Sequence, residues 1–179
     1  LQHSVKTHHP HFMNPLWGGF SPAAFAGEVI SALAQTSMYT HELAPLASQI
    51  ESAIITRMRE MVGFATGTGV LTSGGSNGNL MGVLCARQNH DPRTLNMGSD
   101  SREYAVYVSE TSHYSLRMVV NVLGIGCDNL IHVSCDEEGR MRPERLLEEI
   151  DISIQEGKIP LCVIATSGTT VLGAFDPLV

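Results

Sequence analysis

"TSGGSNGNLMGVLCAR", residues 72–87, joins a short apolar run to an amphipathic helix through a turn that contains Gly74 and Gly75. A turn from a strand into a helix presents backbone N–H groups at the positive end of the helix dipole, where a phosphate dianion is stabilised. Ser76 adds a hydroxyl group beside them. The alternative is a plain turn in which Ser76 is the helix N-cap. By itself the stretch leaves both interpretations open.

The chain around this turn predicts an α/β fold. Short apolar strands are expected at residues 69–72, 104–109, 129–134 and 160–166, and they alternate with helices expected at 77–88, 112–123 and 143–156. Such alternation is typical of parallel βαβ units, whose strands are buried on both faces.

Two further helices are expected before the first strand. Ser21 followed by Pro22 is a helix start signal, and the apolar periodicity continues to about Gln35. A second periodic stretch runs from Pro45 to Val62, and Gly63 is expected to form a left-handed cap. The sequence therefore predicts an N-terminal loop and helical arm over residues 1–62 and the first part of a large domain over residues 63–179.

Composition excludes several classes of function. The chain has 179 residues, of which 43% are hydrophobic, so one substantial core is expected. A net charge of −7 and scattered Lys and Arg argue against nucleic acid. The apolar runs fall far short of the roughly 20 residues of a membrane span. Four cysteines without a CxxC pair indicate reduced thiols and a cytoplasmic protein.

Known nucleotide-binding loops do not match the glycine turn. A Walker A loop ends in Gly-Lys-Ser/Thr, whereas Gly157-Lys158 is followed by Ile159. A dinucleotide fingerprint would need a third glycine after Gly67 and Gly69, where Thr72 stands. A phosphate ligand of this turn is therefore expected to belong to another class.

Two other strand ends carry polar groups. In "SETSHYS", residues 109–115, His113 lies between a strand and a helix, where ligands of open α/β sheets gather. Its imidazole could stack on a flat ring or transfer a proton, or it could be a helix cap or surface group. "IATSGTT", residues 164–170, is a strand that ends in hydroxyl residues. "HHPHF", residues 8–12, has no Cys, Asp or Glu nearby to complete a site, so no metal is expected.

Six stretches, taken in order, resemble the group II pyridoxal-phosphate-dependent decarboxylases. They are "HPHFMNPLWGG", "MYTHELAP", "TSGGSNGNL", "SETSHYS", "CDEEGRM" and "ATSGTTVLGAFDPL". The similarity runs from Ser4 to Leu178 in one register. It is greatest with the branch that decarboxylates glutamate, cysteine sulfinate or aspartate.

The resemblance implies the fold-type I aminotransferase architecture, pyridoxal 5'-phosphate as cofactor, and a homodimer with shared active sites. It assigns the cofactor phosphate to Gly75, Ser76 and Asn77, the face of the pyridine ring to His113 as the catalytic residue, and a position close to the cofactor to Thr170. Substrate contacts are implied for the N-terminal loop and for a segment that approaches from the partner subunit. These residues are His11, Phe12 and Asn14 in the loop, and Tyr39 and Thr40 in the segment.

The expected activity is that of a carboxy-lyase, which converts an acidic amino acid to its amine and carbon dioxide. The two lysines, Lys6 and Lys158, both lack the His-Lys context of the family lysine that binds the cofactor as a Schiff base. That lysine and the aspartate that holds the pyridine nitrogen are expected after Val179. Residues 1–179 are expected to be a truncated, inactive segment when isolated.

The sequence leaves open the substrate and two alternatives to the decarboxylase function. Glutamate-type members typically carry Asn-Gln-Leu where this chain has Asn14-Pro15-Leu16, and proline has no amide to bind a distal carboxylate. Cysteine sulfinate, aspartate or another amino acid remains a candidate. The alternatives are another fold-type I enzyme, such as a desulfurase or aminotransferase, and a non-catalytic pseudoenzyme or fragment that acts through a dimer surface.

Overall fold

The computed structural model describes residues 3–14, 16, 18–98 and 102–178. The chain divides into two compact units, Leu1–Leu71 and Thr72–Val179.

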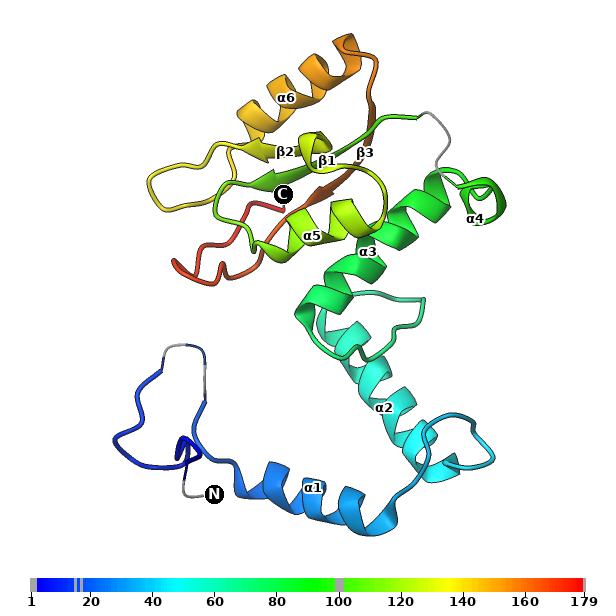
Figure 1. The fold of residues 1–179 in the computed structure, drawn as a ribbon, viewed down its shortest axis with the longest axis vertical. Helices are drawn as coiled ribbons and strands as arrows, with labels where there is room; N and C mark the ends of the chain where they lie inside the picture. Colours follow the sequence, from blue (N-terminus) through cyan, green and yellow to red (C-terminus); the bar gives the residue numbers. More distant parts are fainter. Residues whose placement is uncertain (1–2, 15, 17, 99–101, 179) are drawn as a thin grey trace. The chain divides into compact units, whose positions relative to one another are not determined.

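A three-stranded parallel sheet forms the centre of the unit Thr72–Val179 (Figure 1). Strand β1 (Tyr104–Ser109) lies between β2 (Leu130–Val133) and β3 (Ile159–Ile164), and it pairs in parallel with both. All six residues of β1 are buried. The α/β fold with parallel βαβ units is therefore confirmed.

Helices cover both faces of this sheet. On one face, Val106 and Val108 pack with Val83 of α3 (Gly75–His90) and Val120 of α5 (Ser115–Val122). On the other face, Tyr107 packs with residues that include Ile150 of α6 (Pro143–Gln155). Figure 1 shows α6 on the opposite side of the strands from α3 and α5. Two short helices, α4 (Thr94–Met97) and the 3-10 helix η1 (Cys127–Asn129), complete the unit.

Two helices begin at other residues than predicted. Helix α3 begins at Gly75 and has Gly74 as its N-cap, so the interpretation of Ser76 as an N-cap is wrong. Helix α5 begins at Ser115 rather than Ser112, because the N–H of Ser112 donates to the carbonyl of Ser109 at 3.0 Å and closes a turn. His113 lies in this connection and not inside a helix.

The strand predicted at residues 69–72 is wrong. A β-strand requires a neighbouring strand for its backbone hydrogen bonds, and no described residue supplies one here. Residues 67–70 instead line a hollow of about 320 Å³ along helix α2 (Pro45–Met61). Arg59 donates to the carbonyl of Gly67 at 3.0 Å, and a Cβ atom at Gly69 would lie 3.2 Å from Ile55.

The unit Leu1–Leu71 is helical, as predicted. In helix α1 (Pro22–Ala34) the Ser21 hydroxyl accepts from the N–H of Ala24 at 3.3 Å, and helix α2 is followed by Gly63 with φ of 81°. Only Ala44 is buried among the described residues of this unit. Apolar side chains of α1 stand exposed instead: Phe25, Val29, Ile30 and Leu33. The described residues of this unit therefore form no hydrophobic core of their own.

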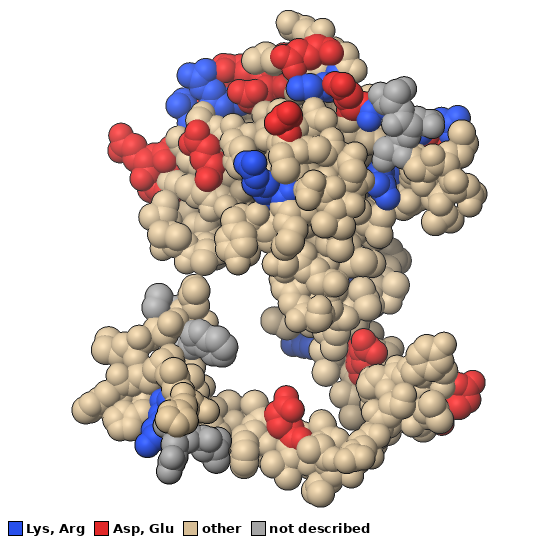
Figure 2. All heavy atoms as spheres, in the orientation of Figure 1, with Lys and Arg blue, Asp and Glu red and all other residues tan. Residues whose placement is uncertain are grey.

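Charged side chains gather over α6 (Figure 2). The helix carries Glu144, Arg145, Glu148, Glu149 and Asp151, and Arg145 pairs with Glu148 at 2.6 Å. Helix α1 carries only Glu28. In the part of the chain that the structure describes, no helix is both long and apolar enough to cross a bilayer.

Candidate active site

The first turn of α3 is open to a ligand. The carbonyl of Gly74 accepts from the N–H groups of Asn77 and Gly78, both at 3.0 Å. Gly74 has no side chain that could cap the helix, so the N–H groups of Gly75 and Ser76 keep their capacity for an external acceptor. A Cβ atom at Gly74 or Gly75 would meet nothing within 4 Å among the described residues. This geometry fits a phosphate group, which needs several converging N–H donors.

His113 is tied to the same helix by a chain of hydrogen bonds. Its Nδ1 lies 2.8 Å from the Ser115 hydroxyl and accepts from the Ser115 N–H at 3.2 Å. The amide of Asn79, on α3, donates to that hydroxyl at 3.0 Å. The imidazole also packs on the Tyr114 ring, with 4.2 Å between centroids and planes 33° apart. The turn before α5 and the N-terminal part of α3 are therefore held together.

The loop after β3 contains Thr170. Its neighbour Thr169 is buried, and the Thr169 hydroxyl accepts from the N–H of Ala174 at 3.0 Å. Thr170 itself is exposed, and within the described residues its side chain makes no hydrogen bond. Because β1 and β3 are parallel neighbours, His113 and Thr170 both follow carboxyl ends of strands at the same edge of the sheet.

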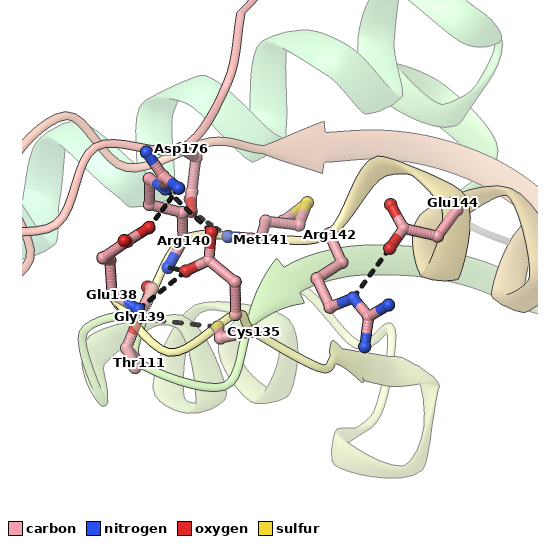
Figure 3. A network of polar contacts seen from close by, with 10 residues as sticks. Thr111, Cys135, Glu138, Gly139, Arg140, Met141, Arg142, Glu144 and Asp176 are labelled. Carbon is pink, nitrogen blue, oxygen red and sulfur yellow. Dashed lines mark hydrogen bonds and ion pairs between the residues drawn. The ribbon is translucent and has the colours of Figure 1, made fainter.

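A buried carboxylate holds this edge together. Asp176, which is 4% exposed, accepts from the N–H of Met141 at 2.7 Å (Figure 3). It also accepts from the N–H of Thr166 at 2.8 Å. Thr111, in the loop after β1, donates to the carbonyl of Gly139 at 2.9 Å. The segment that follows β2 is thus bonded directly to the segments that follow β1 and β3.

A tight turn at residues 136–140 supports the same network. The Asp136 carboxylate accepts from the Arg140 N–H at 2.9 Å and from its guanidinium at 2.8 Å, and these bonds lower the pKa of Asp136. Arg140 also pairs with Glu138. Gly139 has φ of 79°, a backbone conformation that favours glycine, and a Cβ atom there would lie 2.6 Å from the end of the Leu172 side chain.

The other predicted site residues belong to the unit Leu1–Leu71. The His11 ring meets the His9 ring edge-on at 5.3 Å, Phe12 is half-buried, and the Asn14 side chain accepts from the N–H of Leu16 at 2.9 Å. Tyr39 is 88% exposed, and Thr40 is half-buried. Pro15 lies outside the described residues.

The sequence did not predict three residues that lie near the carboxyl-terminal edge of the sheet: Asn79, Ser115 and Asp176. Asn79 and Ser115 are 36 positions apart, so their contact leaves no local pattern. Asp176 lies in the quoted stretch "ATSGTTVLGAFDPL", but an isolated aspartate gives no sign that it will be buried. The one available signal was the spacing of His113 and Ser115 at a helix start, where a serine hydroxyl commonly bonds to a nearby group.

A family model described as the pyridoxal-dependent decarboxylase conserved domain matches residues 1–179. The chain belongs to this family. The family resemblance found in the six sequence stretches is thereby confirmed, as is the fold-type I architecture, because the solved neighbours share it.

Relatives in this family include two curated decarboxylases. Over 179 residues the chain is 41% identical to human cysteine sulfinic acid decarboxylase, and over 180 residues it is 40% identical to glutamate decarboxylase of Drosophila melanogaster. Each comparison covers 99% of this chain but only 36% and 35% of the relative, so the chain spans about a third of their length. The crystal structure of mouse CSAD is 42% identical, with a TM-score of 0.95, over 98% of this chain and 37% of that one.

The Asp176 links predict a stability effect. We expect Asp176→Asn to lower the free energy of unfolding by about 1–3 kcal/mol, because an amide NH₂ would then face one of two backbone N–H donors. Asp151→Asn, on the exposed surface of α6, is the matched control and should change it by less than about 0.5 kcal/mol. Urea unfolding of both variants measures the difference. Equal effects would mean that the Asp176 bonds do not hold the loops.

Proposed function

We propose that the complete protein is a pyridoxal-phosphate-dependent carboxy-lyase that decarboxylates an acidic amino acid. The observation that carries this proposal is the hydrogen-bonded attachment of His113 to the helix whose first turn is open to a phosphate. A phosphate site and an imidazole held beside it are the two parts that a phosphorylated, flat aromatic cofactor needs. Membership of the pyridoxal-dependent family supports the same cofactor.

The cofactor contacts follow from this arrangement. Gly75 and Ser76 would bind the phosphate through backbone N–H groups at the positive end of α3, and the side chains of Ser76 and Asn77 would add hydrogen bonds. His113 would lie against one face of the pyridine ring, and Thr170 would lie close to the cofactor. When bound, pyridoxal phosphate supplies an electron sink for the charge left at Cα after carbon dioxide departs.

The contribution of this chain to the reaction is orientation. Decarboxylation is fastest when the bond to the carboxylate is held perpendicular to the ring, and a fixed group on one face limits how the substrate can lie. The hydrogen bonds at Nδ1 and the contact with Tyr114 hold the His113 ring in one position. His113 is therefore the residue of this unit that we propose as catalytic.

Lys158 is a poor candidate for the lysine that binds the cofactor. Its ammonium group pairs with Glu156 at 2.9 Å, and this contact raises the pKa of Lys158. A lysine nucleophile needs a lowered pKa, so that the neutral amine is available. We therefore propose that the cofactor lysine lies outside residues 1–179. The alternative of a pseudoenzyme holds if the complete protein lacks such a lysine.

The substrate is proposed to be acidic, with cysteine sulfinate or aspartate favoured over glutamate. Cysteine sulfinic acid decarboxylase and glutamate decarboxylase are both relatives at about 40% identity, so identity alone does not separate the two substrates. The residue at position 15 disfavours glutamate, because proline offers no donor to a distal carboxylate. His11, Phe12, Asn14, Tyr39 and Thr40 are the substrate contacts that we propose.

A homodimer would cover the apolar face of the N-terminal arm. The unit Leu1–Leu71 buries only Ala44 among its described residues, while Ile30 and Leu33 of α1 are 66% and 81% exposed. Large apolar side chains gathered and exposed on one helix indicate a contact with another protein surface. We propose that a second copy provides it, and that Tyr39 and Thr40 reach the partner's active site.

The cysteines support a cytoplasmic location. All four are free thiols, and burial raises the pKa of the Cys162 thiol to about 11. A thiol with a raised pKa is unreactive, as expected of a structural cysteine in a reducing compartment.

Replacement of His113 tests the catalytic assignment. We expect His113→Gln to lower kcat of the complete protein about 100-fold, the loss expected when a reactant is no longer held in its reactive orientation. His132→Gln, which changes an exposed histidine on β2, should leave kcat within about twofold. Steady-state assays of amine formation give both values. Similar activity in the two variants would mean that His113 is not part of the active site.

Substrate preference is tested by an amine-product assay with cysteine sulfinate, aspartate and glutamate. We expect kcat/KM to be lowest for glutamate, and Pro15→Gln to raise the glutamate value about tenfold because an amide donor is restored. The cysteine sulfinate value in the same variant is the internal control. If the unaltered protein prefers glutamate, the assignment of position 15 is incorrect.

The proposed dimer is tested on α1. We expect Leu33→Asp to raise the dimer dissociation constant at least about tenfold, since a charge would then be buried in an apolar contact. Ser31→Asp adds the same charge two positions away, at a different angle around the helix, and should have a smaller effect. Sedimentation velocity over a range of concentrations measures both. A monomeric unaltered protein would refute the dimer.

A further inference from the structure

We propose that Ser115 and Asn79 are positioning residues that fix His113 as the neutral tautomer with its proton on Nε2. His113 then acts at the proposed active site as a hydrogen-bond donor, and not as a base. The tautomer follows from contacts within this chain, whereas its role in decarboxylation rests on the proposed function.

The backbone N–H of Ser115 decides which ring nitrogen is unprotonated. An N–H group can only donate, and this one points at His113 Nδ1 from 3.2 Å. A proton on Nδ1 would set two N–H groups against each other. Nδ1 is therefore the acceptor, and in a neutral imidazole the proton must be on Nε2.

The Ser115 hydroxyl strengthens this assignment. Its oxygen lies 2.8 Å from His113 Nδ1 and accepts from the Asn79 amide at 3.0 Å. With the amide donating to the oxygen, the single hydroxyl proton is directed to Nδ1. If the amide were reversed, its oxygen would compete with Nδ1 for that one proton, and only the backbone N–H of Ser115 would be left to bond to Nδ1. The donor chain therefore runs from Asn79 through Ser115 to His113.

Burial protects these hydrogen bonds between Asn79, Ser115 and His113. Ser115 has no exposed surface, and Asn79 is half-buried on α3, so water does not readily replace either partner. A flip of the His113 ring would put a carbon atom where Nδ1 lies and leave the Ser115 N–H and O–H without their acceptor. The Tyr114 ring, 4.2 Å from the imidazole, restricts the same motion.

The fixed tautomer limits what His113 can do. Nε2 already carries a proton, so it can donate a hydrogen bond to an anionic oxygen but cannot take up a proton. Nδ1 is already occupied by two donors. We therefore assign to His113 the orientation of an anionic group of the substrate or cofactor, and the proton that Cα receives after decarboxylation must come from another residue.

Nitrogen-15 NMR of the histidine-labelled complete protein tests the tautomer. At about pH 8 an ordinary histidine is neutral, so each ring gives one protonated and one unprotonated nitrogen signal. The His113 signals are assigned by their loss in His113→Gln. We expect His113 to show the single Nε2–H form without any cofactor or substrate added. An Nδ1–H form, or an equal mixture, would overturn the proposal.

Two variants test the positioning residues. Asn79→Asp replaces the donor by an acceptor that attracts the Ser115 proton, so the Nδ1–H form should gain population. Ser115→Ala keeps the backbone N–H but removes the hydroxyl donor, so the Nε2–H form should lose part of its population, and kcat should fall at least about fivefold with KM little changed. Ser153→Ala removes another buried hydroxyl, which bonds to the Glu149 carbonyl at 2.8 Å, and should leave the His113 signals unchanged. Unchanged His113 signals in both Asn79→Asp and Ser115→Ala would contradict the proposal.

The tautomer of His113 and the proposed function can be contradicted independently. An Nε2–H tautomer in a protein that decarboxylates no amino acid would contradict the proposed function and leave the tautomer assignment intact. Decarboxylation by a protein whose His113 carries its proton on Nδ1 would contradict the tautomer assignment alone.

Discussion

The parallel pairing of β1 with β2 and β3 is the constraint on which the rest of the structure depends. Because β1 pairs in parallel with both neighbours, all three strands end at the same edge of the sheet. That edge brings together the turn with His113, the segment at residues 135–142 and the loop at residues 165–176. Asp176 and Thr111 then connect these segments by hydrogen bonds.

The fold was largely predictable where the local pattern and the tertiary environment agree. Strand β1 was predicted with its observed bounds, since its Tyr and Val residues favour a buried strand. The start of α3 was not predicted correctly, because its N-cap is Gly74, which has an extended backbone and no side chain to signal a cap. The strand at residues 69–72 failed because pairing depends on a partner that no local pattern reveals.

The candidate site was predictable in its parts but not in its connections. The glycine turn and His113 stood out as strand-to-helix junctions, and the family resemblance supplied their expected roles. The contact of Asn79 with Ser115 joins two helices that are distant in sequence, and we propose that it helps to fix the tautomer of His113. The burial of Asp176 likewise depends on three loops meeting, which is a property of the folded sheet. The roles of His11, Phe12, Asn14, Tyr39 and Thr40 rest on resemblance.

The central claim is that one unit of this chain holds a cofactor phosphate at the first turn of α3 and presents His113 to the cofactor ring. A crystal structure of the complete protein grown with pyridoxal phosphate tests it most directly. The account predicts phosphate oxygens within hydrogen-bond distance of the N–H groups of Gly75 and Ser76, and the imidazole of His113 against one face of the ring. A cofactor bound elsewhere, or a ring that His113 does not touch, would contradict it.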